Sequence, residues 1–179
     1  MKGDVDKWLK DYGEDFMRNV GISRGQSVLD FGCGSGNYTI PTARVVGDKG
    51  IVYALDKDRR ALDELMRRAK LEGLVNIKRI DTSGEVRIEL DDESVDVVLL
   101  YDIFWYFPPS DARLTKLLAE VYRVLKYGGI LSVLPKHTDP DQLRRKIEEA
   151  GFRLKDEYYG TIIHSGVLED GWVFNFIKG

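Results

Sequence analysis

The stretch of sequence that decides the fold is Val28-Leu29-Asp30-Phe31-Gly32-Cys33-Gly34-Ser35-Gly36-Asn37. Its apolar first half predicts a short buried strand that ends at the first glycine. Three glycines at alternate positions then let the backbone approach a ligand closely, because no Cβ intervenes. In open parallel sheets, ligands bind beyond the carboxyl ends of the strands. The stretch therefore predicts a ligand site at the end of the first strand of a parallel sheet.

Strands and helices alternate along most of the chain, and the last two strands have no helix between them. The periodicity predicts helices over residues 5–20, 37–46, 58–72, 114–125 and 140–150. It predicts strands over 27–31, 51–56, 77–80, 95–101, 130–134, 152–159 and 172–177. Gly128 and Gly129 are expected to end the fourth helix. The pattern predicts an α/β fold, a Rossmann-like three-layer sandwich. Its seven-stranded sheet is mostly parallel, with an antiparallel C-terminal strand pair.

Composition bounds the class of protein. The 179 residues suit a single domain, 1–179, in which residues 1–24 form an N-terminal helix and partial lid. Lysine and arginine number 27 against 30 aspartates and glutamates, a net charge of −3, which argues against a nucleic-acid partner. With one cysteine, Cys33, and two histidines, no metal site is expected. The sequence shows neither a signal peptide nor a membrane-spanning run. We expect a cytoplasmic protein, a monomer or a homodimer.

The order of the glycines and the carboxylates beside them narrow the class of ligand. The dinucleotide-binding fingerprint needs a glycine where this chain has Asn37, and a phosphate beside Asp30 would meet a like charge. Asp56 ends the second predicted strand, where an acidic side chain can accept hydrogen bonds from ribose hydroxyls. These features favour a nucleoside that carries a cationic group. They disfavour a nicotinamide-dependent oxidoreductase.

Five segments of the chain match motifs of one protein family. They are Asp30–Gly36, Tyr53–Asp56, Ile80–Asp81, Val95–Asp102 and Arg123–Gly129. Through them the chain resembles the class I S-adenosylmethionine (SAM)-dependent methyltransferases, and within them the small quinone-biosynthesis-like (type 11) branch. The resemblance covers nearly the whole chain. Tyr127 stands where the family has a proline, and the two glycines after it still permit the turn.

The resemblance implies SAM as the cofactor and ten residues that bind it. They are Asp30, Gly32, Cys33, Gly34, Gly36, Asp56, Lys57, Asp81, Thr82 and Tyr101. Asp30 is expected near the methionine end and Asp56 at the ribose. Asp81, with the backbone of Thr82, is expected at the adenine. The alternative for Asp81, and for Asp102, is a carboxylate that caps a strand end.

Catalysis of methyl transfer depends mainly on the alignment of the acceptor with the methyl group and on the exclusion of water. A general base is needed only if the acceptor loses a proton, and Asp102 and His137 are the candidates. The alternative for His137 is a surface histidine that caps the next helix. His164 is expected to be structural or exposed, in the connection between the last two strands. Cys33 is interpreted as a small residue in a tight turn rather than a nucleophile.

Aromatic residues follow the fourth predicted strand and suggest where the acceptor binds. Tyr12, Asp102, Trp105 and Tyr106 are predicted to line the substrate pocket, which suits a flat or apolar molecule. The alternative is that the aromatic rings pack the following helix onto the sheet. The predicted function is methyl transfer from SAM to a small-molecule acceptor. The alternative function is that of a non-catalytic SAM-binding module or partner subunit.

Overall fold

The structure, a computed structural model, describes residues 2–179 and contains alternating helices and strands. The helices are α1 (Lys2–Lys7), α2 (Gly13–Val20), α3 (Thr39–Val46), α4 (Arg59–Leu71), α5 (Ala112–Val124) and α6 (Pro140–Glu149), with a π-helical turn, η1 (Trp8–Tyr12), between the first two. The strands are β1 (Ser27–Phe31), β2 (Ile51–Asp56), β3 (Ile77–Asp81), β4 (Val95–Leu100), β5 (Leu125–Val133), β6 (Phe152–His164) and β7 (Val167–Lys178). Helices α4, α5 and α6 begin where the side chains of Asp58, Asp111 and Asp139 accept hydrogen bonds from first-turn N–H groups.

All seven strands form one sheet in the order β3-β2-β1-β4-β5-β7-β6. Neighbouring strands from β3 to β5 are parallel, whereas β7 lies antiparallel to both β5 and β6. The predicted fold class is confirmed. The strand order reverses between β1 and β4, so the carboxyl ends of these two strands flank the crevice in which open α/β sheets bind ligands.

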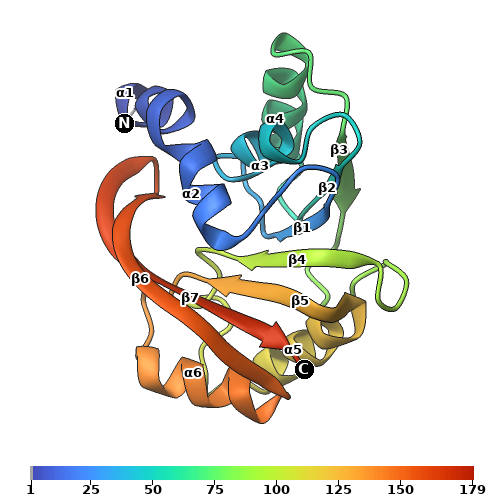
Figure 1. The fold of residues 1–179 in the computed structure, drawn as a ribbon, viewed down its shortest axis with the longest axis vertical. Coiled ribbons are helices and arrows are strands. Elements are labelled where there is room, and N and C mark those ends of the chain that lie inside the picture. The colour runs from blue at the N-terminus through green and yellow to red at the C-terminus, as the bar shows by residue number, and fades with distance from the viewer. Residues whose placement is uncertain (1) are drawn as a thin grey trace.

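Helices cover both faces of the sheet (Figure 1). On one face, α1 to α4 pack over a core that contains Trp8, Leu65 and Val97. On the other face, α5 and α6 pack over a second core that contains Val98 and Leu118. Val97 and Val98 are neighbours in β4 and point to opposite faces, as successive strand residues do. Burial on both faces explains why the sequence of β4 is almost continuously apolar.

The N-terminal helix differs from the prediction at Tyr12. A regular helix would place Tyr12 on the buried face, one turn after Trp8. In the structure the N–H of Gly13 instead donates to the carbonyl of Trp8, the π-helical pattern, which adds one residue to this turn. Gly13 therefore takes the buried position, where a Cβ would come within 2.9 Å of Pro41. Tyr12 is left 36% exposed.

The predicted boundary between α5 and β5 is wrong. Gly128 and Gly129 do not end the helix, which stops at Val124. Leu125 is already extended (φ −72°, ψ 136°) and pairs with Val95 of β4. The register of the two strands shifts directly after this pair, so the glycines lie in an irregular part of β5 rather than at a helix terminus.

The C-terminal strand pair is longer than predicted, with 13 residues in β6 and 12 in β7. The hairpin bends past the edge of the sheet toward α1 (Figure 1), where the N–H of Leu168 donates to Oδ2 of Asp4 at 3.1 Å. His164, predicted to lie in the connection, is instead the last residue of β6. Within residues 2–179, the structure contains no helix of the length and apolarity needed to cross a membrane.

Candidate functional site

Two cavities open at the carboxyl edge of the sheet and meet beside the glycine-rich turn. The first cavity, of about 490 Å³, includes Asp56 and Lys57 from the end of β2. The second cavity, of about 870 Å³, includes Asp30 from β1 and reaches α1 and α4. Four residues line both cavities: Gly32, Gly34, Asp102 and Trp105. One elongated ligand can therefore extend from one cavity into the other past these four residues.

Backbone hydrogen bonds hold the glycine-rich turn against the end of β2. The N–H groups of Gly32 and Cys33 donate to the carbonyl of Leu55, at 2.8 and 3.1 Å. The N–H of Gly34 donates to Oδ2 of Asp56 at 2.7 Å. The turn is thus fixed where the two cavities meet.

The three glycines of the turn have different requirements. Gly32, Gly34 and Gly36 all have positive φ angles, of 75°, 54° and 91°, which favour glycine. At Gly34 an added Cβ would meet no atom within 4 Å, so a side chain there would project into the space that the cavities share. Gly36 lines neither cavity in the described part of the chain, and a Cβ there would collide with Leu65 of α4. Packing, rather than ligand access, requires the third glycine.

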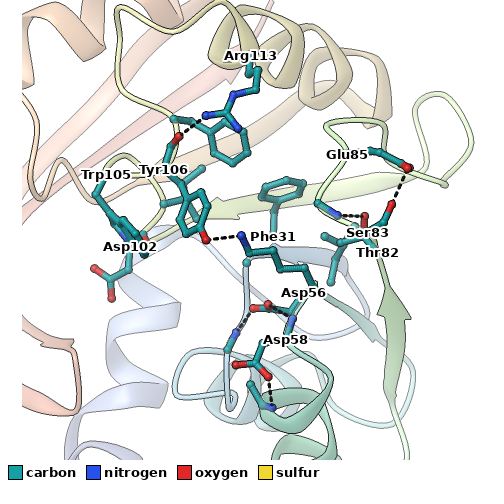
Figure 2. A pocket seen from close by; sticks show the side chains of 18 residues that line it. Phe31, Asp56, Asp58, Thr82, Ser83, Glu85, Asp102, Trp105, Tyr106 and Arg113 are labelled. Atoms are coloured by element: carbon teal, nitrogen blue, oxygen red, sulfur yellow. Dashed lines mark hydrogen bonds between the residues drawn. The ribbon is translucent and has the colours of Figure 1, made fainter.

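Both carboxylate oxygens of Asp56 are bonded to backbone amides (Figure 2). Oδ2 accepts from Gly34, and Oδ1 accepts from the N–H of Asp58 at 2.8 Å. An ionised carboxylate has about four lone-pair sites, so each oxygen can accept one further hydrogen bond. Asp56 lines the first cavity, where it is placed to accept hydrogen bonds from two neighbouring hydroxyls of a ligand.

Asp30 is a buried carboxyl group at the edge of the second cavity. Its side chain accepts one hydrogen bond within residues 2–179, from the hydroxyl of Thr39 at 2.7 Å. Burial raises the pKa of Asp30 to about 7 against the lowering effect of that bond, and the carboxylates of Asp56 and Asp102 add to the rise. A buried carboxyl group of this kind suits a ligand that brings a positive charge.

Lys57 and Tyr106 both line the first cavity, in which Figure 2 shows the ring of Tyr106. The ammonium of Lys57 bonds to the hydroxyl of Tyr106 and lies 3.6 Å from the centre of its ring. Thr82 lines the same cavity, but Asp81 is not among its lining residues. The carboxylate of Asp81 is held by Arg79 in two hydrogen bonds of 2.8 Å. The structure thus brings Lys57 and Thr82 to the cavity and pairs Asp81 with Arg79.

Tyr101 and Cys33 are buried groups that line the second cavity. The hydroxyl of Tyr101 is hydrogen-bonded to that of Ser132 at 2.6 Å. Burial raises the pKa of the Cys33 thiol far above its usual range, so the sulfur is not a thiolate nucleophile. Among residues 2–179 no group of three or more His, Cys, Asp or Glu side chains could hold a metal ion.

Hydrogen bonds of Tyr38 connect the end of the glycine-rich turn to the C-terminal hairpin. Its hydroxyl donates to the carbonyl of Ile163 at 2.7 Å and accepts from the N–H of the same residue at 3.2 Å. On the other side of the turn, the indole N–H of Trp8 donates to the carbonyl of Asn37 at 2.7 Å. The second cavity is therefore bounded by parts of the chain that are far apart in the sequence.

Asp102 contacts a histidine that the sequence analysis did not assign to the site. Oδ1 of Asp102 lies 2.5 Å from Nδ1 of His164, and Nε2 of His164 lies 3.0 Å from Nε2 of His137. Asp102 and His137 both have left-handed backbone conformations, with φ of 56° and 58°. The predicted candidates Asp102 and His137 are thus connected through His164. The sequence around His164 carries no local signal of this, because the contact depends on the length of β6.

The aromatic segment after β4 divides into two groups. Phe104 and Phe107 are buried in the core beneath α5, as the packing interpretation expected. Trp105 is 60% exposed and lines both cavities, and Tyr106 lines the first. The indole N–H of Trp105 donates to the carbonyl of Asp102 at 2.9 Å, and its ring lies 4.2 Å from that of Tyr106. Trp105 and Tyr106 therefore form an exposed pair of aromatic rings at the cavities.

The N-terminal helices reach the second cavity through residues other than Tyr12. Val5 and Asp6 of α1 and Leu9 of η1 line this cavity, together with Gly166 of the β6–β7 turn. Tyr12 is not among the residues that line either cavity, because the π-helical turn rotates it outward.

Comparisons with known proteins agree on one family. A family model described as a methyltransferase domain matches residues 28–129. A demethylmenaquinone methyltransferase of Geobacillus stearothermophilus is 29% identical over 167 residues, 93% of this chain and 68% of that protein. One from Geobacillus sp. strain WCH70 is 32% identical over 161 residues, 89% and 66% of the two chains. The chain thus spans about two thirds of the length of these relatives. A crystal structure of a SAM-dependent methyltransferase from Aquifex aeolicus superimposes with a TM-score of 0.73 and 22% identity, covering 100% of this chain and 99% of that one.

Proposed function

Since the chain belongs to the methyltransferase-domain family, as a class I SAM-dependent methyltransferase of the quinone-biosynthesis-like branch, we propose that it transfers the methyl group of SAM to a small aromatic acceptor. The observation that carries the proposal is the meeting of two cavities beside the glycine-rich turn, at Gly32 and Gly34. Asp56 lies in one cavity and the buried Asp30 in the other. These two carboxylates, one in each cavity, are suited to a ligand that carries a ribose in one half and a positive charge in the other.

The residues of the two cavities fit the two halves of the cofactor. Asp56 is proposed to accept hydrogen bonds from the ribose hydroxyls, and Lys57 and Thr82 to border the adenine. Asp30 is proposed to face the positive charge of the methionine half. Gly34 lets the backbone approach the cofactor where the halves join. When bound, SAM supplies a methyl group on a sulfonium sulfur, which is already activated toward a nucleophile.

Two of the predicted cofactor-binding residues have structural roles instead. Asp81 is held by Arg79, and glycine is needed at position 36 by the packing of Leu65. We do not assign these two residues to SAM. Cys33 and Tyr101 keep their proposed places as buried walls of the second cavity beside the methionine half.

The proposed acceptor is a small, flat aromatic molecule. Trp105 and Tyr106 present exposed rings at the junction and the first cavity. Aromatic rings stack on such surfaces in an offset or edge-to-face manner. The name of the related enzymes, demethylmenaquinone methyltransferase, supports an acceptor with a quinone-derived ring.

Equilibrium dialysis with SAM and with NAD tests the cofactor, and transfer of tritiated methyl from SAM to reduced demethylmenaquinone tests the reaction. We expect binding of SAM and not of NAD, and transfer of label to the acceptor. Binding of NAD alone would refute the assignment of the cofactor. Binding of SAM without transfer to this acceptor or to simpler naphthols would instead favour the non-catalytic SAM-binding module.

A further inference from the structure

Asp102, His164 and His137 form a hydrogen-bonded chain that leads from the two cavities to the protein surface. We propose that Asp102 accepts the proton of a hydroxyl group on the acceptor, and that His164 and His137 are positioning residues that hold Asp102 for this task. The proposal rests on the proposed methyl transfer and deepens it. It assigns the acceptor to weakly acidic hydroxyl compounds, the phenols and enols.

Asp102 lies where the two cavities meet. The sulfonium sulfur joins the adenosine and methionine halves of SAM, so a cofactor that extends through both cavities has its methyl group near their junction. Four residues line that junction. Gly32 and Gly34 have no side chains, and the indole of Trp105 is a donor only. Asp102 is the one residue of the four with a group that can take up a proton.

The hydrogen bonds of the chain determine which ring nitrogens carry hydrogen. An ionised carboxylate only accepts, so Nδ1 of His164 must donate to Oδ1 of Asp102. In a neutral imidazole the other nitrogen is then an acceptor. Nε2 of His164 therefore accepts from Nε2–H of His137. Asp102 thus fixes the tautomer of His164, and His137 completes the hydrogen bonds of its ring. His164 in turn fixes the orientation of the carboxylate, whose second oxygen remains available to the acceptor.

The backbone conformation supports a functional arrangement. Asp102 and His137 both occupy the left-handed region, where residues other than glycine are uncommon and conformational energy is lost. The indole N–H of Trp105 holds the carbonyl of Asp102 in this conformation. Two of the three members of the chain thus adopt unfavourable conformations that bring their side chains to His164.

The surroundings of Asp102 determine the direction of its pKa. The charged and titratable groups that face it are His164 from β6, His137 and Lys136 from the segment after β5, Asp30 from β1, and Tyr38 from the turn before α3. Lys136 is itself paired with Glu169 of β7 at 2.5 Å. Burial raises the pKa of Asp102, and the hydrogen bond from His164 opposes this rise. A raised pKa makes the carboxylate a better proton acceptor, provided that the pH keeps it ionised.

In the proposed step the O–H bond of the acceptor breaks, and its hydrogen binds the free oxygen of the Asp102 carboxylate. The electron pair left on the acceptor oxygen forms the bond to the methyl carbon. The methyl–sulfur bond breaks with its electron pair on sulfur, which gives S-adenosylhomocysteine. Release of the proton to solvent restores the carboxylate. With a naphthol as the acceptor, we expect the methyl group on oxygen.

A pair of matched acceptors tests the role of Asp102. At pH 8 the hydroxyl of 1-naphthol is protonated, whereas that of 4-nitro-1-naphthol is ionised and needs no base. With Asp102→Asn we expect kcat for 1-naphthol to fall by about 10²–10⁴-fold. We expect the nitrated compound to lose less than about tenfold, because proton transfer is not part of its reaction. The control Asp91→Asn, at an exposed aspartate, should change neither rate.

Variants of the histidines test their positioning role. In His164→Phe, loss of the bond that lowers the Asp102 pKa should move the acid limb of the kcat profile to higher pH. His164→Gln, whose amide can donate to Asp102, should restore part of the rate. His137→Ala should lower kcat in the native background but not in His164→Phe, because it acts through His164. Equal effects of His137→Ala in both backgrounds, or an unmoved acid limb, would overturn the positioning role.

Nitrogen-15 NMR of the ligand-free protein gives a readout that is independent of activity. The chain has two histidines, so the spectrum contains two imidazoles to assign. We expect His164 as the Nδ1–H tautomer and His137 as the Nε2–H tautomer at neutral pH. In His137→Ala, His164 should keep the Nδ1–H tautomer, because Asp102 still accepts from Nδ1. The Nε2–H tautomer of His164 in the native protein would contradict the proposal.

The failure of this proposal can be told apart from failure of the proposed function. If the native protein does not bind SAM, the proposed function is wrong. If it binds SAM and methylates other aromatic compounds, but neither naphthol nor reduced demethylmenaquinone, the assignment to hydroxyl acceptors is wrong. If Asp102→Asn methylates 1-naphthol at the native rate, the role of Asp102 is wrong and methyl transfer itself stands.

Discussion

The backbone N–H of Gly34 donates a 2.7 Å hydrogen bond to Oδ2 of Asp56, 22 residues further along the chain. This bond joins the glycine-rich turn after β1 to the end of β2. The carboxylate that is proposed to bind the ribose is therefore also the group that positions the turn over which the cofactor passes. Loss of Asp56 is therefore expected to weaken SAM binding in two ways: the contact with the ribose is lost, and the turn is no longer held in position.

Replacement of Asp56 by alanine should weaken SAM binding by at least about 1–3 kcal/mol, because charge-assisted hydrogen bonds to the ribose are lost. Isothermal titration calorimetry measures the change directly. The exposed Asp91 offers a control, since Asp91→Ala removes a carboxylate from the surface and should leave the affinity unchanged. Equal affinities of native protein and Asp56→Ala would show that the ribose is held by other residues.

Gly34→Asn should abolish SAM binding while the protein stays folded. Asparagine tolerates a positive φ better than other side chains, and at Gly34 it would extend into the space that the cavities share. Gly73 is the matched control, because its φ is +69° and a Cβ there also meets no atom within 4 Å. Gly73→Asn should bind SAM normally. Circular dichroism checks the fold of both variants, and normal SAM binding by a folded Gly34→Asn would contradict the assignment.

The raised pKa of Asp30 predicts a particular pH dependence of stability. The folded protein holds this proton to about pH 7, whereas an unfolded chain releases it near 3.8. Folding is therefore favoured by this group at low pH, and its contribution is lost as the pH rises from about 4 to 7. The loss for one carboxyl group is on the order of 4 kcal/mol.

Asp30→Asn removes this titration and retains an oxygen that can accept from Thr39. In urea unfolding without ligand, the variant should gain stability relative to the native protein between pH 5 and pH 8. Saturating SAM should reduce the gain at pH 8, because its positive charge stabilises the ionised Asp30. A difference between the two proteins that does not change with pH would contradict the prediction.

Arg123 stabilises the segment before β4 through buried backbone contacts. Its guanidinium donates to the carbonyls of Ile88 and Leu90 at 2.7 and 2.8 Å. Arg123→Gln should therefore lower the free energy of unfolding by about 1–3 kcal/mol. Arg144 forms an exposed pair with Glu148, and Arg144→Gln should change it by less than about 1 kcal/mol. Equal effects in denaturant titrations would show that the contacts of Arg123 contribute little.

Sequence analysis predicted the positions of residues that directly follow the strand that holds them. Gly34 and Asp56 follow buried strands directly, and strand ends in a parallel sheet meet at one edge. The exposure of Tyr12 could not be predicted in this way. A single π-helical turn moves its side chain out of the buried face, and the spacing of apolar residues does not reveal such a turn.

His164 was missed for a different physical reason. It lies 62 residues from Asp102, and the contact exists only because β6 continues to His164 before the chain turns. The alternation of exposure along this edge strand stops at Tyr159, before the strand ends at His164, so the periodicity gives no marker for the end. Long-range register, unlike a local turn, is decided by the whole sheet.

The bonds between Tyr38 and Ile163 have a consequence for protein synthesis. The two residues are 125 positions apart, so the ribosome makes Tyr38 well before Ile163. A nascent chain that already contains the glycine-rich turn still lacks the hairpin that completes the wall of the second cavity. The methyl donor therefore cannot help the earlier part of the chain to fold, and competence to bind it arises only after the hairpin has been synthesised.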